Sequence, residues 1–341
     1  MILFDTTSAS NWKHASGLAR VSRRLREELG PRCRALAWPE IAAAAKTGDW
    51  ILTPELFSDA ERPGFAAFLG KRPCRIAAIY HDSIPMKHPA ITWPKSVERH
   101  PGYVKLLSQF DRVWAVSHAS REELLGIWAW QGVAHPPPVD VLPLGADWPD
   151  FPRARGGAPE SGRVRKIVAT GIIEPRKNQT VLLDACTELR KEGVEVELHL
   201  VGRVNPHFGK PIARRLKALM SGWPGLRHHA TLGDAGLAAL LRSARATAFP
   251  SLAEGCGLPL LESLWMGIPC LCSDIAPLKE NAAGGGCLVV EGNSVQGWTD
   301  ALRRILTDDT LHRKLVAEAG SRSIPTWSEA AAILADELAE I

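Results

Sequence analysis

Glu254 and Glu262 lie in the segment whose residue types most clearly suggest a functional site. This segment, residues 251–262, reads S-L-A-E-G-C-G-L-P-L-L-E. An apolar run predicts a strand before it, and its proline favours a helix that starts near Leu258. Glycines such as Gly257 let the backbone approach a ligand closely. The N–H groups and partial positive charge of a helix N-terminus suit a diphosphate. In the loop, Glu254 could meet sugar hydroxyls, and Glu262 could accept two hydrogen bonds from a ribose diol.

A plain strand–turn–helix connection with surface glutamates is the alternative, which the combination of residues disfavours. A second motif, G-I-I-E-P-R-K-N, follows another predicted strand and places Gly171 at the strand end. Its adjacent cations, Arg176 and Lys177, could neutralise a diphosphate leaving group, because fixed charges stabilise developing charge without reorganising. They would do the work of a Mg²⁺ ion, so we expect no metal and no cofactor. Taken alone, such cations could also simply face solvent.

Two further candidates lie in the first half of the chain. His81 ends a predicted strand next to Asp82, which could orient the imidazole for a hydrogen bond to a hydroxyl. Such a pair is also common in purely structural roles. Residues 11–20 lead into a helix and contain Gly17, and their N–H groups could meet a phosphate or an acceptor.

Alternating strands and helices must position these motifs. Predicted strands cover residues 2–5, 34–38, 50–53, 75–80, 112–116, 139–143, 166–171, 196–201, 228–232, 246–250, 269–273 and 287–290. Predicted helices cover residues 16–29, 179–191, 211–220, 235–243, 258–266 and 327–341. This alternation is typical of parallel sheets, whose ligands bind outside the carboxyl ends of the strands.

We therefore predict an α/β protein with two tandem Rossmann-like, doubly wound parallel-sheet domains and an active site in the cleft between them. The first domain would cover residues 1–150, and a Pro- and Gly-rich linker residues 151–162. The second would cover residues 163–322. The closing segment, 323–341, contains an amphipathic helix that could return to the first domain.

Composition restricts the class of protein. The 341 residues are 45% hydrophobic and 23% charged, which is ordinary for a globular chain. No run reaches the roughly 18–20 apolar residues of a membrane-spanning helix, and residues 1–5 read as a strand rather than a secretory signal. The seven cysteines are scattered without a C-x-x-C pair, which favours reduced thiols in the cytoplasm over disulfides or a zinc site.

Positive charge is concentrated near the N-terminus. Residues 13–34 hold seven Lys or Arg against two Glu, in a chain of net charge +4. Either this is a solvated helix face, or it attracts anionic lipid headgroups or a phosphate-bearing acceptor. We expect no nucleic acid partner, because no recognition motif accompanies the cluster.

With these motifs in view, the chain resembles the GT4 family of retaining glycosyltransferases, which have the GT-B architecture. Glu254 and Glu262 match the family's E-x7-E motif, and residues 171–178 are similar to its G-x-x-E-P-R-K-N segment. Residues 81–85, H-D-S-I-P, resemble the H-D-L-I-P of members that build bacterial surface polysaccharides, often with mannose or rhamnose.

The resemblance implies retaining transfer of a hexose, with mannose or rhamnose favoured, from a nucleotide-diphosphate sugar, with a GDP-sugar favoured. The acceptor would be a glycan or polyprenyl-linked glycan bound by the first domain, at the cytoplasmic face of the cell membrane. A nucleotide-sugar epimerase on a similar scaffold, or a catalytically silent sugar-binding protein, remains as an alternative.

The resemblance also implies residue roles. Glu254 would contact the transferred sugar and Glu262 the ribose, while His81 would position a sugar hydroxyl. The diphosphate would be held by Arg176 and Lys177, with help from the backbone at Gly257 and Leu258.

Overall fold

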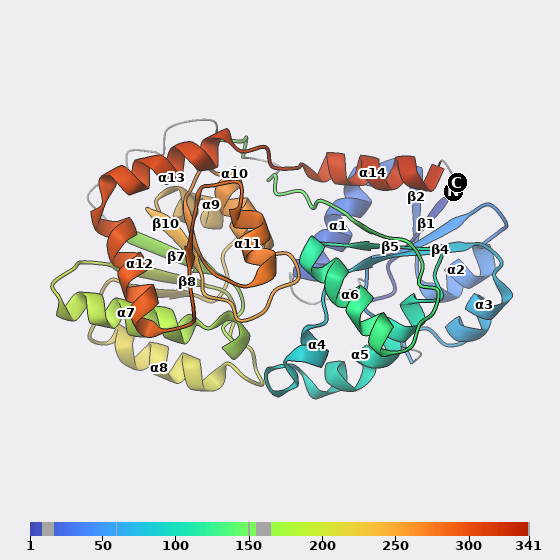
Figure 1. Cartoon of the computed structure of the whole chain (residues 1–341), viewed down its shortest axis with the longest axis horizontal. Coiled ribbons are helices and arrows are strands. Elements are labelled where there is room, and N and C mark those ends of the chain that lie inside the picture. Colours follow the sequence, from blue (N-terminus) through green and yellow to red (C-terminus); the bar gives the residue numbers. More distant parts are fainter. Residues whose placement is uncertain (9–16, 59, 149–150, 155–164, 340–341) are drawn as a thin grey trace. The chain divides into compact units, whose positions relative to one another are not determined.

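The computed structural model describes residues 1–8, 17–58, 60–148, 151–154 and 165–339. It divides into two compact units, Met1–Gly145 with Pro325–Ile341, and Ala146–Ile324. Each unit is built on its own six-stranded sheet, and Figure 1 shows the helices that flank each sheet. Among the helices within these ranges, none combines the length and the apolar character needed to cross a bilayer.

The sheet of the first unit has the strand order β2-β1-β3-β4-β5-β6, and all neighbours are parallel. Its strands are β1 (Ile2–Asp5), β2 (Cys33–Leu36), β3 (Trp50–Thr53), β4 (Arg75–Tyr80), β5 (Arg112–Ala115) and β6 (Val139–Val141). Its helices are α1 (Gly17–Leu29), η2 (Gly30–Arg32), α2 (Trp38–Ala44), α3 (Phe65–Lys71), α4 (Ile84–Lys87), η3 (Pro89–Ile91), α5 (Pro94–Leu107), α6 (His118–Trp130) and α14 (Trp327–Ala339).

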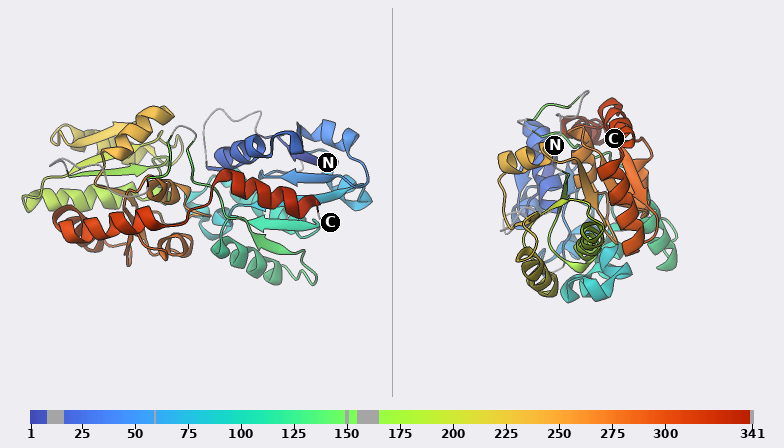
Figure 2. Two further views of the ribbon diagram at one scale, coloured as in Figure 1. Left: turned by 90° about the horizontal axis from the view of Figure 1, so that it is seen from above. Right: turned by 90° about the vertical axis from the view of Figure 1, so that its left-hand side faces the viewer.

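Both faces of this sheet are covered. Alternate strand residues such as Leu3 and Ile51 join one core with α2, α3, α5 and α6. Their neighbours Phe4 and Leu52 are equally buried and point to the other face, because side chains alternate along a strand. On that face α14 packs beside α1, and Figure 1 and the left view of Figure 2 agree on this. The last helix thus belongs to the first unit.

The sheet of the second unit has the order β12-β11-β10-β7-β8-β9, again entirely parallel. Its strands are β7 (Lys166–Thr170), β8 (Glu197–Val201), β9 (Leu226–His229), β10 (Ala246–Phe249), β11 (Cys270–Ser273) and β12 (Cys287–Val290). Its helices are η4 (Pro175–Lys177), α7 (Gln179–Lys191), α8 (Lys210–Met220), α9 (Asp234–Arg242), α10 (Leu258–Trp265), α11 (Ala276–Ala282), α12 (Val295–Thr307) and α13 (Asp309–Ser321).

Alternation along the strands divides this unit into two cores as well. Ile167 and Ala169 pack with α7, α8 and α12, whereas Val168 packs with α9, α10, α11 and part of α13. Strands buried on both faces read as continuous apolar runs, which is why the sequence predicted them. The predicted pair of doubly wound parallel sheets is confirmed.

Several boundaries differ from the prediction. The strand predicted at 34–38 ends at Leu36, because Trp38 already begins α2, which has a proline in its first turn. The strand predicted at 228–232 lies at Leu226–His229. The units meet at 145/146 rather than at 150/151, and Arg153, in the predicted linker 151–162, donates to the carbonyls of α10 and α13. Residues 155–164 lie outside the described ranges.

Candidate functional site

The candidate site of the second unit lies where its strand order reverses. From β7 the chain proceeds to β8 and β9 on one side, and from β10 to β11 and β12 on the other. In open α/β sheets, ligands bind at this switch point, outside the carboxyl ends of the strands. The loops that follow β7 and β10 meet there, and Leu252 N donates to Arg176 O at 2.8 Å. Two motifs far apart in the sequence are thus brought together within one unit.

Glu254 joins the two loops through its carboxylate. It accepts from Lys177 Nζ at 2.5 Å and from Arg176 Nη1 at 3.3 Å. Arg176 also donates to Ala253 O at 2.9 Å and to Glu174 Oε1 at 3.0 Å through Nε. Arg176 and Lys177, with Glu174 and Glu254, form a group of zero formal charge. We call these four residues the donor cluster.

The donor cluster is shielded but still reached by solvent. The side chains of Lys177 and Glu254 are each 11% exposed, and that of Arg176 is 20% exposed. Burial tends to raise the pKa of Glu254, but the cations of Lys177 and Arg176 outweigh burial and lower this pKa to about 2. Burial lowers the pKa of Lys177, and Glu254 opposes that change. Glu254 is therefore a carboxylate at every physiological pH.

The N-terminus of α10 adjoins Glu254. Gly257 caps the helix with a positive φ of 87°, which glycine adopts without strain. A Cβ at this position would also lie 2.5 Å from Leu278 Cδ2. The helix starts at Leu258, the following Pro259 has no N–H, and Leu260 N donates to Gly257 O at 3.0 Å, so the first turn offers a ligand the Leu258 N–H and the partial positive charge of the helix end. Glu262 lies further along α10 and is 7% exposed.

Gly202, Asn205 and Gln179, which were not predicted from the sequence, help to shape the loop after β7. Gly171 has a φ of 139°, and its carbonyl oxygen lies only 2.1 Å from the place of a Cβ on Gly202. Asn205 Nδ2 donates to Glu174 Oε2 at 2.8 Å, and Gln179 Nε2 donates to Ile172 O at 2.9 Å. Glycine directly after both β7 and β8 was a signal available in the sequence.

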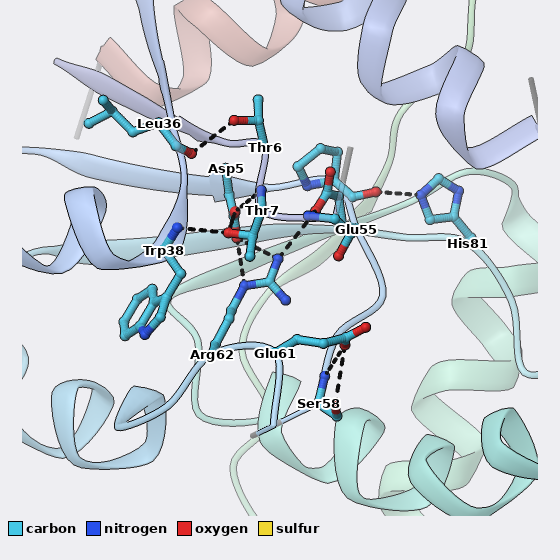
Figure 3. Close-up of polar contacts among 12 residues, drawn as sticks. Asp5, Thr6, Thr7, Leu36, Trp38, Glu55, Ser58, Glu61, Arg62 and His81 are labelled. Carbon is cyan, nitrogen blue, oxygen red and sulfur yellow. Dashed lines mark hydrogen bonds and ion pairs between the residues drawn. The ribbon is translucent and has the colours of Figure 1, made fainter. Parts of the chain in front are cut away.

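His81 and Gly17 belong to the first unit. His81 Nε2 lies 2.8 Å from Pro54 O, and Figure 3 marks this contact of the His81 ring with a dashed line. A carbonyl only accepts, so Nε2 carries the hydrogen and the neutral ring keeps its lone pair on Nδ1. Burial lowers the pKa of His81, which favours this neutral form. His81 can therefore accept a hydrogen bond from a hydroxyl.

The predicted orientation of His81 by Asp82 is wrong. Asp82 Oδ1 instead accepts from Ile84 N at 2.9 Å at the start of α4, and Pro54 orients the imidazole. Gly17 is the exposed first residue of α1, and residues 9–16 before it are not among those described. In the described part of the chain, no group of three His, Cys, Asp or Glu side chains is placed to hold a metal ion.

Comparison with known proteins identifies relatives. Residues 164–308 match the family described as "Glycosyl transferases group 1". The chain is 32% identical to the MMP alpha-(1->4)-mannosyltransferase of Mycolicibacterium hassiacum, over 69% of this chain and 56% of that protein. It is 31% identical to the O-antigen chain mannosyltransferase B of Escherichia coli, over 41% of this chain and 36% of that protein. The chain thus spans about half or less of these relatives' lengths.

Solved structures share the fold. A sucrose-phosphate synthase from Thermosynechococcus elongatus superimposes with a TM-score of 0.76 at 18% identity, covering 99% of this chain and 98% of that one. Anabaena HepE, solved with UDP and glucose, has a TM-score of 0.75 at 14% identity, covering 100% and 99%. These findings confirm the predicted two-domain GT-B fold and the resemblance to the GT4 family.

Proposed function

Since residues 164–308 match the glycosyl transferases group 1 and the chain is similar to bacterial mannosyltransferases, we propose that it is a retaining, metal-independent hexosyltransferase of the GT4 type. Its donor would be a nucleotide-diphosphate sugar, with a GDP-sugar that carries mannose or rhamnose favoured. Its acceptor would be a glycan or polyprenyl-linked glycan of a bacterial surface polysaccharide. The mannosyltransferase relatives, one of which acts on an O-antigen chain, support this choice.

The donor cluster is the observation that carries the proposal. Arg176 and Lys177 stand at the switch point beside the N-terminus of α10, where the cations and the partial positive charge of the helix end together suit a diphosphate. A diphosphate at this place would compete with Glu254 for Lys177. Released from that ion pair, Glu254 could accept a hydrogen bond from the transferred sugar. Donor binding and sugar orientation would then be one event.

Transfer breaks the bond between the anomeric carbon and the phosphate oxygen, and forms one to the acceptor oxygen on the same face. The acceptor proton would pass to the leaving diphosphate, whose charge Arg176 and Lys177 stabilise without reorganising. His81, with Nδ1 as acceptor, would position a sugar hydroxyl rather than transfer a proton. Because the fixed cations would replace a divalent ion, we expect the initial rate to persist in excess EDTA.

Donor binding is the direct test. Nucleoside diphosphates of each base should be titrated by calorimetry, and the tightest should raise the melting temperature by mass action. We expect Glu262→Ala to weaken binding of the nucleoside diphosphate more than binding of pyrophosphate, because the ribose contact is lost. Glu188→Ala, an exposed change on α7, is the matched control. Equal affinity of Glu262→Ala and the parent protein for every nucleotide would refute the ribose role.

Catalysis needs its own assay. Transfer from a panel of GDP-, UDP- and dTDP-hexoses to glycan acceptors should give a product with the anomeric configuration of the donor, read by NMR. Donor epimerisation without acceptor would support the epimerase instead. Tight nucleotide binding with no turnover of any donor would support a silent binding protein.

We also propose that the basic N-terminal segment, residues 13–34, binds an anionic membrane surface. The helix α1 exposes Arg23 and Arg26, whereas Arg24 is buried and pairs with Glu28, so charge reversal belongs at the first two positions. Flotation with vesicles containing 30% phosphatidylglycerol should fall with salt and in Arg23→Glu/Arg26→Glu. The same change in net charge at exposed Lys95 and Lys105 is the control. Unchanged flotation of the first variant would disprove the proposal.

A further inference from the structure

A buried arginine occupies the switch point of the first sheet. The strand order reverses between β1 and β3, and Arg62 bridges residues at the carboxyl ends of both (Figure 3). Asp5 ends β1, and Glu55 follows β3 by two residues. Arg62 and Glu55 are fully buried, and Asp5 is 1% exposed. We call these three residues the arginine bridge.

Arg62 is held on several sides. Its Nε donates to Asp5 Oδ2 at 2.8 Å, and its Nη2 lies 2.6 Å from the same oxygen. Nη2 also donates to Glu55 Oε2 at 3.4 Å. The guanidinium lies over the ring of Phe57, 3.8 Å from its centroid. The guanidinium thus has a single position relative to β1 and β3.

The two carboxylates in turn hold the chain after β1. Glu55 Oε2 accepts from Ser8 N at 2.7 Å, and Asp5 Oδ1 accepts from Thr7 N at 3.0 Å. Glu55 directly follows Pro54, whose carbonyl oxygen accepts from His81 Nε2. Arg62 therefore fastens the turn after β1 to the loop that orients His81.

Stability alone does not account for this arrangement. Burying a guanidinium and two carboxylates carries a desolvation penalty that their attraction barely repays, and apolar side chains of similar volume are often as stable. A buried ionic network does fix geometry, because a buried charged atom that loses its partner raises the free energy of the folded state; in Arg62, Nε and Nη2 have such partners, whereas Nη1 makes no hydrogen bond within the described residues. The site served by that geometry is His81 and the turn at residues 5–8.

We propose that Arg62 and Glu55 are positioning residues of the transferase, which hold His81 and the turn after β1 in the geometry needed for sugar transfer. This inference rests on the proposed function, in which His81 meets a sugar hydroxyl. Without the arginine bridge, Pro54 O would no longer be fixed, and the imidazole would rotate among several orientations. Misplacement of a positioning group by about 1 Å can lower a rate about 100-fold.

A neutral replacement tests the proposal without leaving unpaired buried charges. Asp5→Asn/Glu55→Gln/Arg62→Met keeps oxygen acceptors for Thr7 N and Ser8 N but removes the bridge. We expect kcat to fall about 10- to 100-fold, with the KM for the donor and the affinity for nucleoside diphosphate unchanged. The single change Arg62→Lys keeps the positive charge but lacks the planar, rigid fork of the guanidinium, so its kcat should lie between those of the parent protein and the triple variant.

The control is an ion pair elsewhere in the same unit. Arg112 pairs with Glu337 of α14, and Arg112→Met/Glu337→Gln should lower the melting temperature while leaving kcat unchanged. If the triple variant keeps the kcat of the parent protein, or if the control loses as much activity at equal stability, the positioning role is wrong.

A readout besides activity separates this inference from the proposed function. In protein labelled with ¹⁵N-histidine, the His81 ring nitrogens should report one Nε2–H tautomer in the parent protein and averaged shifts in the triple variant. Unchanged His81 shifts in the triple variant would overturn the inference even if transfer is observed. Averaged shifts in a chain that transfers no sugar would support the arginine bridge and refute the transferase alone.

Discussion

Replacing Glu254 by glutamine should tighten the binding of nucleoside diphosphate while slowing sugar transfer. Glu254 shares Lys177 and Arg176, which are also the groups proposed to hold the diphosphate. Glutamine keeps the shape of the side chain and accepts a hydrogen bond, but it removes the negative charge. The donor cluster then changes from neutral to a net charge of +1, which favours an anion.

The size of the effect follows from the charges. A unit charge about 6 Å from a phosphate interacts by about 3 kcal/mol at an effective dielectric constant of about 20. The partial exposure of Lys177 and Glu254, both 11%, and salt screening reduce this. We expect a net gain of about 1.4 kcal/mol in the binding free energy of the diphosphate, which corresponds to about tenfold in Kd. In the transfer reaction Glu254→Gln accepts a weaker hydrogen bond from the sugar, so kcat should fall.

Calorimetric titration with the tightest-binding nucleoside diphosphate, at two salt concentrations, measures the change in nucleotide affinity. Single-turnover kinetics measure the change in the rate of sugar transfer. Arg176→Met should weaken nucleotide binding. The control is Glu188→Gln, because within the described residues Glu188 forms an ion pair only with Lys191; this variant should leave nucleotide affinity and the transfer rate unchanged. Weaker nucleotide binding by Glu254→Gln, comparable to that of Arg176→Met, would refute the idea that Glu254 competes with the diphosphate.

Three further outcomes follow from the same geometry. The pKa of Glu254 is lowered from 4.5 to about 2, which corresponds to a contribution of about 3 kcal/mol to the free energy of unfolding. This contribution is complete above pH 4.5 and is lost as the pH falls toward 2. Glu254→Gln should therefore flatten the dependence of the urea midpoint on pH below 4.5. Gly202→Ala should lower the melting temperature and weaken nucleotide binding, because its φ of 149° and the Gly171 carbonyl 2.1 Å away leave no room for a Cβ. Gly145→Ala should also lower the melting temperature, since its Cβ would lie 2.1 Å from Trp327 N, but nucleotide affinity, a property of the second unit, should stay as it is.

Strands were more predictable than helices, for physical reasons. Parallel strands covered on both faces are continuous apolar runs, and most lie within one or two residues of the predicted positions. The strand β9 was misplaced because, of its residues, only Leu226 is fully buried. Helices α2, α3 and α5 were not predicted. The first two have seven residues each, only about two helical turns, which is too short to show a repeated apolar pattern, and α5 contains Pro101, which interrupts the pattern.

Site residues could be predicted where one short segment carries them. Arg176, Lys177 and Glu254 each stand in a local motif, and the sequence indicated that both motifs follow strands. Their mutual pairing depends on β7 and β10 being neighbours, which the strand order alone decides. The arginine bridge could not be predicted from the sequence, because it too depends on strand order. Asp5 and Arg62 are 57 residues apart, and in the sequence alone each resembles an ordinary surface charge.

The two switch points carry ion pairs of different character, and exposure distinguishes their roles. An ion pair that a ligand must replace needs access to solvent, since its partners must be rehydrated or transferred as the ligand enters. Arg176, Lys177 and Glu254 meet this condition with 11–20% of each side chain exposed. Arg62 and Glu55 do not, because both are fully buried, so no anion can exchange with them without unfolding the loop after β3. A cluster that cannot exchange can still act by holding its neighbours, and the neighbours here are the turn after β1 and His81. The same type of pair at equivalent places in two similar sheets would thus bind a substrate in one and fix a geometry in the other.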